Sequence, residues 1–150
     1  MTDDRDTDRE ALESASRAVS LVCALLPHLA GLAHFVRIHA DRHVNSAGVF
    51  PTGRLVINPE WWLTMTAREQ AFVLAHELLH LAFRTHERRG TSDATAFNVA
   101  HDLIINDVLE QEIGIEPPGG GLRQPGARHE SAEALLARGG LPEGFGFDPP

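Results

Sequence analysis

The first helix is predicted by a regular spacing of apolar residues near the N-terminus. From about residue 8 to residue 26, leucine, alanine and valine recur every three or four positions, which is the spacing of one helix face. Thr7 and Glu10 are three residues apart and could cap the start of this helix reciprocally. Pro27 is expected to break or kink it. The pattern therefore predicts an amphipathic helix over roughly residues 8–26.

The pattern changes after residue 33 and there predicts short β-strands. Residues 35–38 are rich in Phe, Val and Ile, and two further apolar runs, at 49–50 and 54–58, flank the turn residues 51–53. Two such runs around a Pro-Thr-Gly turn are typical of a β-hairpin. The edge of strand 54–58 could bind an extended peptide as an added strand, since it directly precedes the next helix. The alternative is a purely structural hairpin.

Two further helices are predicted to lie in the core, because apolar residues surround them instead of forming one stripe. The first opens at the capping box formed by Thr66 and Glu69, and it is expected to continue to Gly90. The second covers about residues 93–111. The chain after Gly114 is predicted to form a loop to residue 128, a short helix over 130–138 and a Pro/Gly-rich tail.

Length and composition favour a single α+β domain that is mainly helical. The 150 residues suit one domain, 1–150, with a core at about 8–113. The formal net charge of −8 argues against a nucleic-acid partner. A lone cysteine, Cys23, excludes an internal disulfide and a cysteine-based zinc site. We read neither a secretory signal nor a membrane span, so we expect a cytoplasmic protein without a membrane partner.

The candidate chemistry lies in the sequence His76-Glu77-Leu78-Leu79-His80 on the first core helix. Two histidines four residues apart lie about 40° apart on one helix face, so both can bind one zinc ion. Glu77 can act as general base on a water at that metal. Unpaired polar groups on a buried helix would cost several kcal/mol, and a bound cation removes that cost. The alternative is a pair of histidines satisfied by ordinary hydrogen bonds.

A catalytic zinc site needs a third protein ligand, and His86 is one candidate. It completes the spacing H-x-x-x-H-x-x-x-x-x-H, which resembles the metzincin motif. Phe83, however, stands where that motif has glycine. If the helix continues through Phe83, His86 lies roughly 9 Å beyond His80 and far round the helix, which disfavours it as a ligand.

The second core helix offers a better third ligand. Asn98, Asp102 and Asn106 are spaced four residues apart and form one polar stripe on an apolar helix. A buried carboxylate needs a partner, and a zinc bound by two neutral histidines is suitable. The arrangement resembles gluzincins, which implies Asp102 as ligand and Asn106 as a residue that orients a ligand. His101 is the runner-up ligand or a hydrogen-bonding group at the cleft. Helix-to-loop hydrogen bonds are the alternative role of both asparagines.

The runs LAHELLHLAFRTHERRG and FNVAHDLIIND resemble the bacterial putative metallopeptidase domain. The resemblance takes in GRLVINP and, more weakly, SAEALLARG, and it covers roughly residues 15–140. The family pairs HExxH with N-x-A-x-D-x-x-x-N, matched here from Asn98 to Asn106, although Phe97 stands where relatives usually carry Trp. The resemblance implies a minimal zincin-like fold, with two packed core helices, an N-terminal helix and a small sheet at the cleft edge. It also implies a von Willebrand factor A-like domain as a possible partner.

We therefore expect a zinc-dependent hydrolase, namely a metallopeptidase that binds one Zn²⁺ per chain and acts on a peptide or protein. The expected ligands are His76, His80 and Asp102, with Glu77 as catalytic base and Asn98, Asn106, His101 and His86 around the cleft. The sequence contains no tyrosine, so an oxyanion would have to be held by histidine, arginine, backbone N–H groups or zinc. The alternatives are a zinc amidase with a non-peptide substrate and a metal-stabilised protein-binding module without activity.

Overall fold

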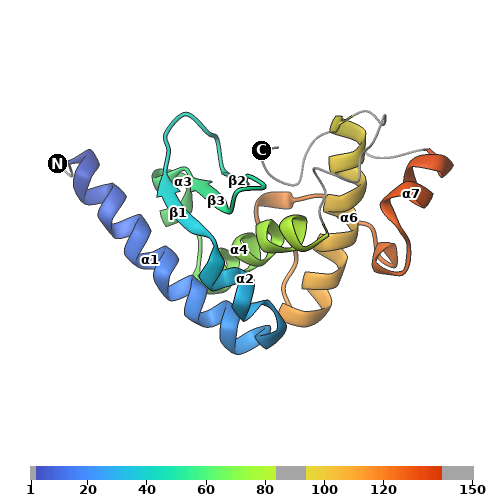
Figure 1. Cartoon of the computed structure of the whole chain (residues 1–150), viewed down its shortest axis with the longest axis horizontal. Coiled ribbons are helices and arrows are strands. Elements are labelled where there is room, and N and C mark those ends of the chain that lie inside the picture. Colours follow the sequence, from blue (N-terminus) through green and yellow to red (C-terminus); the bar gives the residue numbers. More distant parts are fainter. Residues whose placement is uncertain (1–2, 84–93, 140–150) are drawn as a thin grey trace.

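A computed structural model describes residues 3–83 and 94–139 and has three long helices, α1 (Asp4–Leu25), α4 (Ala67–Ala82) and α6 (Ala94–Ile113). Figure 1 shows α4 in the middle of the molecule, with α1 on one side and α6 on the other. The predicted α+β class, mainly helical with a small sheet, is confirmed. The shorter elements are η1 (Pro27–Leu29), α2 (Ala30–Phe35), β1 (Arg37–Ala40), β2 (Ala47–Val49), β3 (Arg54–Ile57), α3 (Pro59–Leu63), η2 (Pro118–Gly120), η3 (Ala127–His129) and α7 (Ala132–Arg138).

Helix α1 begins four residues earlier than the apolar pattern predicts. Asp3 is its N-cap and accepts a hydrogen bond from the backbone N–H of Arg5, while Asp4 and Asp6 place negative charge in the first turn. Acidic side chains there are favoured by the helix dipole. The predicted cap at Thr7 is wrong, because Thr7 lies inside the helix. The predicted break at Pro27 is confirmed, since α1 ends at Leu25 and a 3₁₀ turn follows.

The sheet has the order β1-β3-β2, with β1 parallel and β2 antiparallel to β3. The predicted hairpin is therefore confirmed, but the strand expected at 35–38 begins only at Arg37. Phe35 instead ends α2, and its ring lies so close to Gly53 that a Cβ there would be 2.6 Å away. Strand β3 is paired on both sides, so the expectation that its edge could bind a peptide is wrong.

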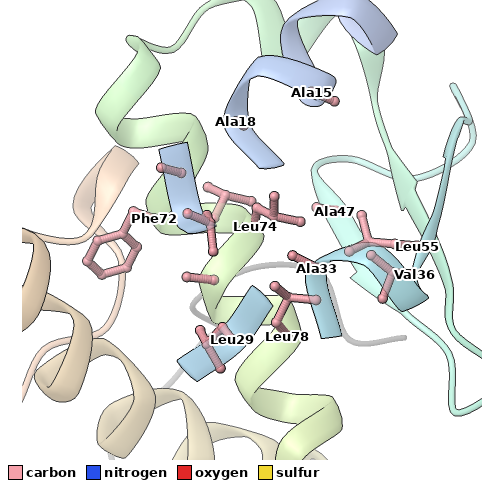
Figure 2. Packing of buried hydrophobic residues seen from close by; sticks show 14 of the residues in the cluster. Ala15, Ala18, Leu29, Ala33, Val36, Ala47, Leu55, Phe72, Leu74 and Leu78 are labelled. Atoms are coloured by element: carbon pink, nitrogen blue, oxygen red, sulfur yellow. The ribbon is translucent and has the colours of Figure 1, made fainter. Parts of the chain in front are cut away.

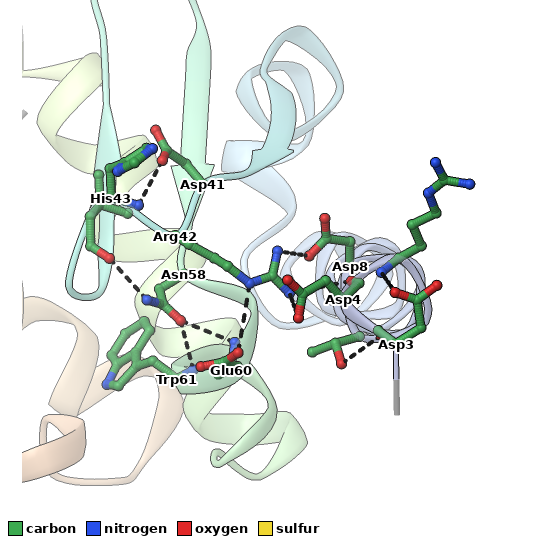
Figure 3. Close-up of polar contacts among 12 residues, drawn as sticks. Asp3, Asp4, Asp8, Asp41, Arg42, His43, Asn58, Glu60 and Trp61 are labelled. Carbon is green, nitrogen blue, oxygen red and sulfur yellow. Dashed lines mark hydrogen bonds and ion pairs between the residues drawn. The ribbon is translucent and has the colours of Figure 1, made fainter. Parts of the chain in front are cut away.

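Two polar side chains fix the sheet to the helices around it (Figure 3). The Arg42 guanidinium lies 2.6 Å from Asp8 of α1 and 3.6 Å from Glu60 of α3. Asn58 caps α3 by accepting from the N–H groups of Glu60 and Trp61, and it donates to the carbonyl of Val44. These contacts hold the connection between β1 and β2 against both helices.

Helix α4 starts where the sequence predicts and ends earlier. The capping box is confirmed: the Glu69 N–H donates to Thr66 Oγ1 at 3.2 Å, and the Thr66 N–H donates to Glu69 Oε1 at 2.9 Å. The prediction that this helix continues through Phe83 is wrong, because α4 ends at Ala82 and Phe83 is its C-cap. The predicted terminator Gly90 lies outside the described residues.

The prediction that α4 lies deep in the core is confirmed, since every residue from Gln70 to His80 is buried. Figure 2 shows Leu74 beside Ala18 of α1 and Ala47 of β2, and Leu78 beside Ala33 of α2. A second apolar cluster lies where α6 meets η3 and α7. Its members are Phe97, Val99, Ala100, Leu103, Ile104, Ala127, Ala132 and Leu135.

The chain after α6 is more ordered than a plain loop. Residues 114–128, predicted as loop, contain η2 and the start of η3, and the predicted short helix is present as α7. The Pro/Gly-rich tail beyond Gly139 lies outside the described residues. Of the helices in the described part of the chain, none combines the length and the apolar character that crossing a membrane requires.

Candidate metal centre

Three titratable side chains converge in the buried space between α4 and α6. His76 and His80 come from successive turns of α4, and Asp102 comes from the middle of α6. Their relative exposures are 1%, 6% and 4%. Helical spacing of four residues places both imidazoles on the α4 face that packs against α6. The sequence therefore predicted this polar group, and the packing of the two helices brings it together.

The metal-binding atoms of these side chains form a small triangle. Asp102 Oδ1 lies 2.9 Å from His76 Nε2 and 2.7 Å from His80 Nε2. The two Nε2 atoms are 3.2 Å apart. Ligand atoms of a tetrahedral zinc with bonds of about 2.0–2.1 Å lie about 3.3 Å from one another. The observed separations are slightly below that value, so a small outward movement of the side chains would admit an ion.

Asn106 decides which nitrogen of His76 can face this triangle. Its side chain is fully buried, and its Oδ1 lies 2.7 Å from His76 Nδ1. The amide orientation follows from the other end, where Nδ2 donates to the carbonyl of Leu122 at 2.8 Å. An amide oxygen only accepts, so His76 Nδ1 must carry a proton. His76 Nε2 donates to Asp102 Oδ1 when it carries a proton, and it offers a lone pair to a metal ion when it does not.

The electrostatics of the group favour a bound cation. Burial raises the pKa of Asp102, but hydrogen bonds from His76 and His80 outweigh it and hold that pKa well below its usual range. Burial lowers the pKa of His76, but the bond to Asp102 and the charges of Asp102 and Glu77 outweigh it, so that pKa is raised. Lone pairs and a carboxylate thus meet at one buried point and attract positive charge, either a proton or a metal ion. The donor set and its spacing fit a metal, and the three residues could hold one.

Glu77 is next to His76 on α4, and its relative exposure is 1%. Burial lowers the pKa of His76, and the negative charge of Glu77 is among the influences that raise it. Two buried acids, Glu77 and Asp102, thus accompany the two buried imidazoles. One carboxylate is enough to complete a three-residue metal site, and Glu77 is not one of the three residues that converge there.

The other candidate residues lie around this group or outside the described residues. The His101 ring is buried against Phe97, with ring centroids 4.7 Å apart, and its centroid is 6.3 Å from that of His80. Its nitrogens are not part of the three-residue group. Asn98 is half-buried, and within residues 3–83 and 94–139 no hydrogen bond joins it to that group. His86 lies outside the described residues.

Sequence reasoning missed Asp107, which organises the chain beside the centre. Asp107 is 2% exposed, and its Oδ2 accepts from the N–H groups of Gly126 and Arg128 and from the Arg128 guanidinium. The sequence did contain a signal for it, because Asp107 is a second carboxylate, besides Asp102, on the largely apolar helix predicted over about residues 93–111. The sequence left two roles open for Asn106, contact with a ligand and a helix-to-loop hydrogen bond. The structure shows both, since Asn106 contacts His76 and donates to the carbonyl of Leu122.

Comparison with known proteins adds one finding. Neither the curated proteins nor the solved structures give a significant match. A family model described as "Putative metallopeptidase domain" matches residues 10–134, which include both core helices and every residue of the centre. Because this match spans most of the chain, the protein belongs to the Putative metallopeptidase domain family.

Proposed function

We propose that the protein is a zinc-dependent hydrolase, and specifically a metallopeptidase. The observation that carries the proposal is the convergence of His76 Nε2, His80 Nε2 and Asp102 Oδ1 between two buried helices. Two imidazoles and one carboxylate are a donor set that zinc prefers in catalytic sites, where a fourth position is left for water. Family membership supports peptide hydrolysis as the reaction.

In this proposal the residues at the centre have separate tasks. His76, His80 and Asp102 are the zinc ligands, and the negative charge of Asp102 balances part of the charge of the ion. Asn106 holds the His76 ring with its Nδ1–H bond, so that Nε2 faces the ion. His101, whose ring centroid is 6.3 Å from that of His80, is a hydrogen-bonding group beside the site. Asn98 and His86 have no assigned task.

The proposed proton transfers use Glu77. A bound zinc supplies the electrophilic chemistry, since it lowers the pKa of a water to about 7 and polarises the scissile carbonyl. Glu77 takes the proton from the attacking water and later gives it to the leaving amine. Glu77 directly follows the proposed ligand His76 on α4, and this position beside the site supports the assignment.

Metal analysis of the purified protein tests the ligand assignment. We expect about one zinc per chain in the wild type and in Glu77→Gln, and loss of zinc in Asp102→Ala. His86→Ala is the matched variant for the competing assignment and should retain zinc. Zinc that is retained in Asp102→Ala and lost in His86→Ala would overturn the ligand set.

A peptide-library assay tests the reaction. Glu77→Gln should lose at least roughly 10²-fold in rate while it keeps its zinc, since a general base contributes about that much. Cleavage of non-peptide amides but of no peptide would favour the amidase alternative. A zinc-loaded wild type that is as inactive as Glu77→Gln on all substrates would favour a metal-stabilised binding module.

A further inference from the structure

Two arginines project from the face of the sheet that is turned away from the helical core. Along β3, Leu55 and Ile57 belong to the apolar cluster around α4, whereas Val56 is buried outside that cluster. Because side chains alternate between the two faces of a strand, Arg54 shares the outer face with Val56. Arg37 of β1 is the register partner of Arg54, and both arginines are exposed. Two guanidinium groups therefore lie side by side on this face.

The charges of these two arginines are not balanced by neighbouring carboxylates. Within residues 3–83 and 94–139, neither Arg37 nor Arg54 forms an ion pair, whereas Arg42 binds acidic side chains of two helices. Acidic residues are nevertheless abundant, since the chain has 21 of them and only 13 basic ones. Like charges on register partners of neighbouring strands repel each other. A negatively charged group from outside the chain would remove this repulsion.

An apolar pocket of about 400 Å³ includes Arg54 in its lining. Its volume lies within the range of about 300–1,000 Å³ that is typical of ligand pockets. Four of its lining residues are apolar, namely Val44, Phe50, Pro51 and Val56. The pocket therefore offers space for a large apolar side chain beside a positive charge.

Exposed aromatic side chains adjoin the same hairpin turn. Phe35 and Phe50 are 55% and 39% exposed, and in the described part of the chain only one other large apolar side chain is exposed. The Phe50 N–H donates to the Arg54 carbonyl at 2.8 Å, and the Phe35 ring lies against Gly53. Apolar groups that gather at one exposed place mark an interaction site. We call this group the hairpin surface, and it consists of Phe35, Arg37, Phe50, Arg54 and Val56.

We propose that the hairpin surface binds an acidic segment of a partner protein that carries a large apolar side chain. The apolar side chain enters the pocket, and carboxylates next to it pair with Arg37 and Arg54, since guanidinium groups bind carboxylates in bidentate geometry. A short segment contacts only this surface. A nucleic acid or an anionic membrane would extend beyond it and meet the remainder of a chain with a net charge of −8. The hairpin surface lies on the opposite face of the sheet from α4, so the proposal does not depend on the proposed metal centre.

One carboxylate, Asp41, also lines the pocket. Its Oδ1 accepts from the backbone N–H of His43 at 2.8 Å (Figure 3), and among the described residues no ion pair joins it to Arg37 or Arg54. Its charge opposes an acidic ligand. Asp41→Asn removes that charge and keeps an acceptor oxygen for His43, so this variant should bind the acidic segment about 2-fold more tightly or better.

Binding of short synthetic peptides to the full-length protein tests the proposal. The probes carry one Leu, Phe or Trp flanked by Asp and Glu. Matched probes have Asn and Gln in place of the acids, or Ala in place of the apolar residue. The acidic apolar probes should bind, the neutral probes about 5-fold more weakly, and the Ala probes about 10-fold more weakly or worse. Amide NMR shifts on binding should map to residues 50–56.

Substitutions of the two arginines test the assignment of the charges. Arg37→Gln and Arg54→Gln should each weaken binding of the acidic probes about 5-fold and leave binding of the neutral probes unchanged. Arg17→Gln is the matched control, because it removes the same charge from an exposed position on α1. It should bind all probes as the wild type does. A double variant with Arg37→Glu and Arg54→Glu should instead prefer probes that carry Lys in place of the acids.

Four results would overturn the proposal. The first is equal binding of the acidic probes by the wild type and by the double variant with Arg37→Gln and Arg54→Gln. The second is the absence of binding by every probe at about 1 mM. The third is binding that disappears when a chelator removes zinc, because the peptide would then lie at the proposed metal centre. The fourth is a dimer of the wild type that the double variant does not form, since the occupant would then be a second copy of the chain.

Discussion

The two faces of helix α4 are equally buried and very different in chemistry. One face, represented by Leu74 and Leu78, packs against α1, α2 and the sheet with apolar contacts (Figure 2). The face toward α6 carries His76 and His80 against Asp102, with Phe72 one turn before them. Apolar burial stabilises by about 25 cal/mol per Å², whereas buried charged groups must overcome several kcal/mol of desolvation each. The first face therefore supplies stability, and the second is retained for another reason, which we propose is metal binding.

Leu74→Ala should have the largest effect on the stability of the metal-free protein. Removing a fully buried leucine costs about 2–5 kcal/mol in the free energy of unfolding, because a cavity remains. Leu74 points away from α6, so zinc should still stabilise this variant as much as it stabilises the wild type. Chemical denaturation with and without zinc measures both quantities. Loss of the zinc effect in Leu74→Ala would show that the two faces are coupled.

On the face of α4 toward α6, we expect replacement of polar side chains by apolar ones to increase stability. Replacing His76, His80 and Asp102 together by leucine should raise the free energy of unfolding of the metal-free protein by about 1–4 kcal/mol, since apolar groups avoid the desolvation of the buried ions. The same variant should gain nothing from zinc. Asp102→Ala alone is the control and should destabilise, because it leaves two imidazoles without their carboxylate. A triple variant less stable than the wild type would mean that these side chains were contributing stability after all.

The smallest effect is a dependence on pH that has opposite signs with and without metal. Because Asp102 raises the pKa of His76, the attraction between them is fully present below pH of about 6.5 and is lost as the pH rises through the raised pKa. Metal-free stability should therefore fall over that range, while zinc affinity should rise by about tenfold per pH unit for each proton displaced. Asp102 stays ionised throughout, since its pKa is lowered. Calorimetric titration from about pH 5 to pH 9 measures the zinc affinity, and denaturation measures the stability. Zinc affinity that is constant with pH would contradict competition between proton and metal at His76.

Local patterns were sufficient to predict much of the fold. The period of the apolar residues predicted α1, α4 and α6, the Pro-Thr-Gly turn predicted the hairpin, and Thr66 and Glu69 predicted the start of α4. Errors arose at ends of elements, where capping residues compete. Asp3 moved the start of α1, and Phe83 ended α4 instead of continuing it. The parallel pairing of β1 with β3 has no local signal, since it depends on a connection through β2.

By itself, the sequence determined which side chains could form the centre. Helical periodicity put His76 and His80 on one face of α4, and it put Asp102 and Asn106 on one face of α6, because these relations depend only on spacing within a helix. Only the tertiary structure decided that the two faces meet, with Asp102 Oδ1 within 2.9 Å of both histidines. It alone also placed the Leu122 carbonyl at Asn106 and the Arg128 guanidinium at Asp107. Such contacts depend on how helices and loops pack across the chain, and residue spacing within one helix carries no information about them.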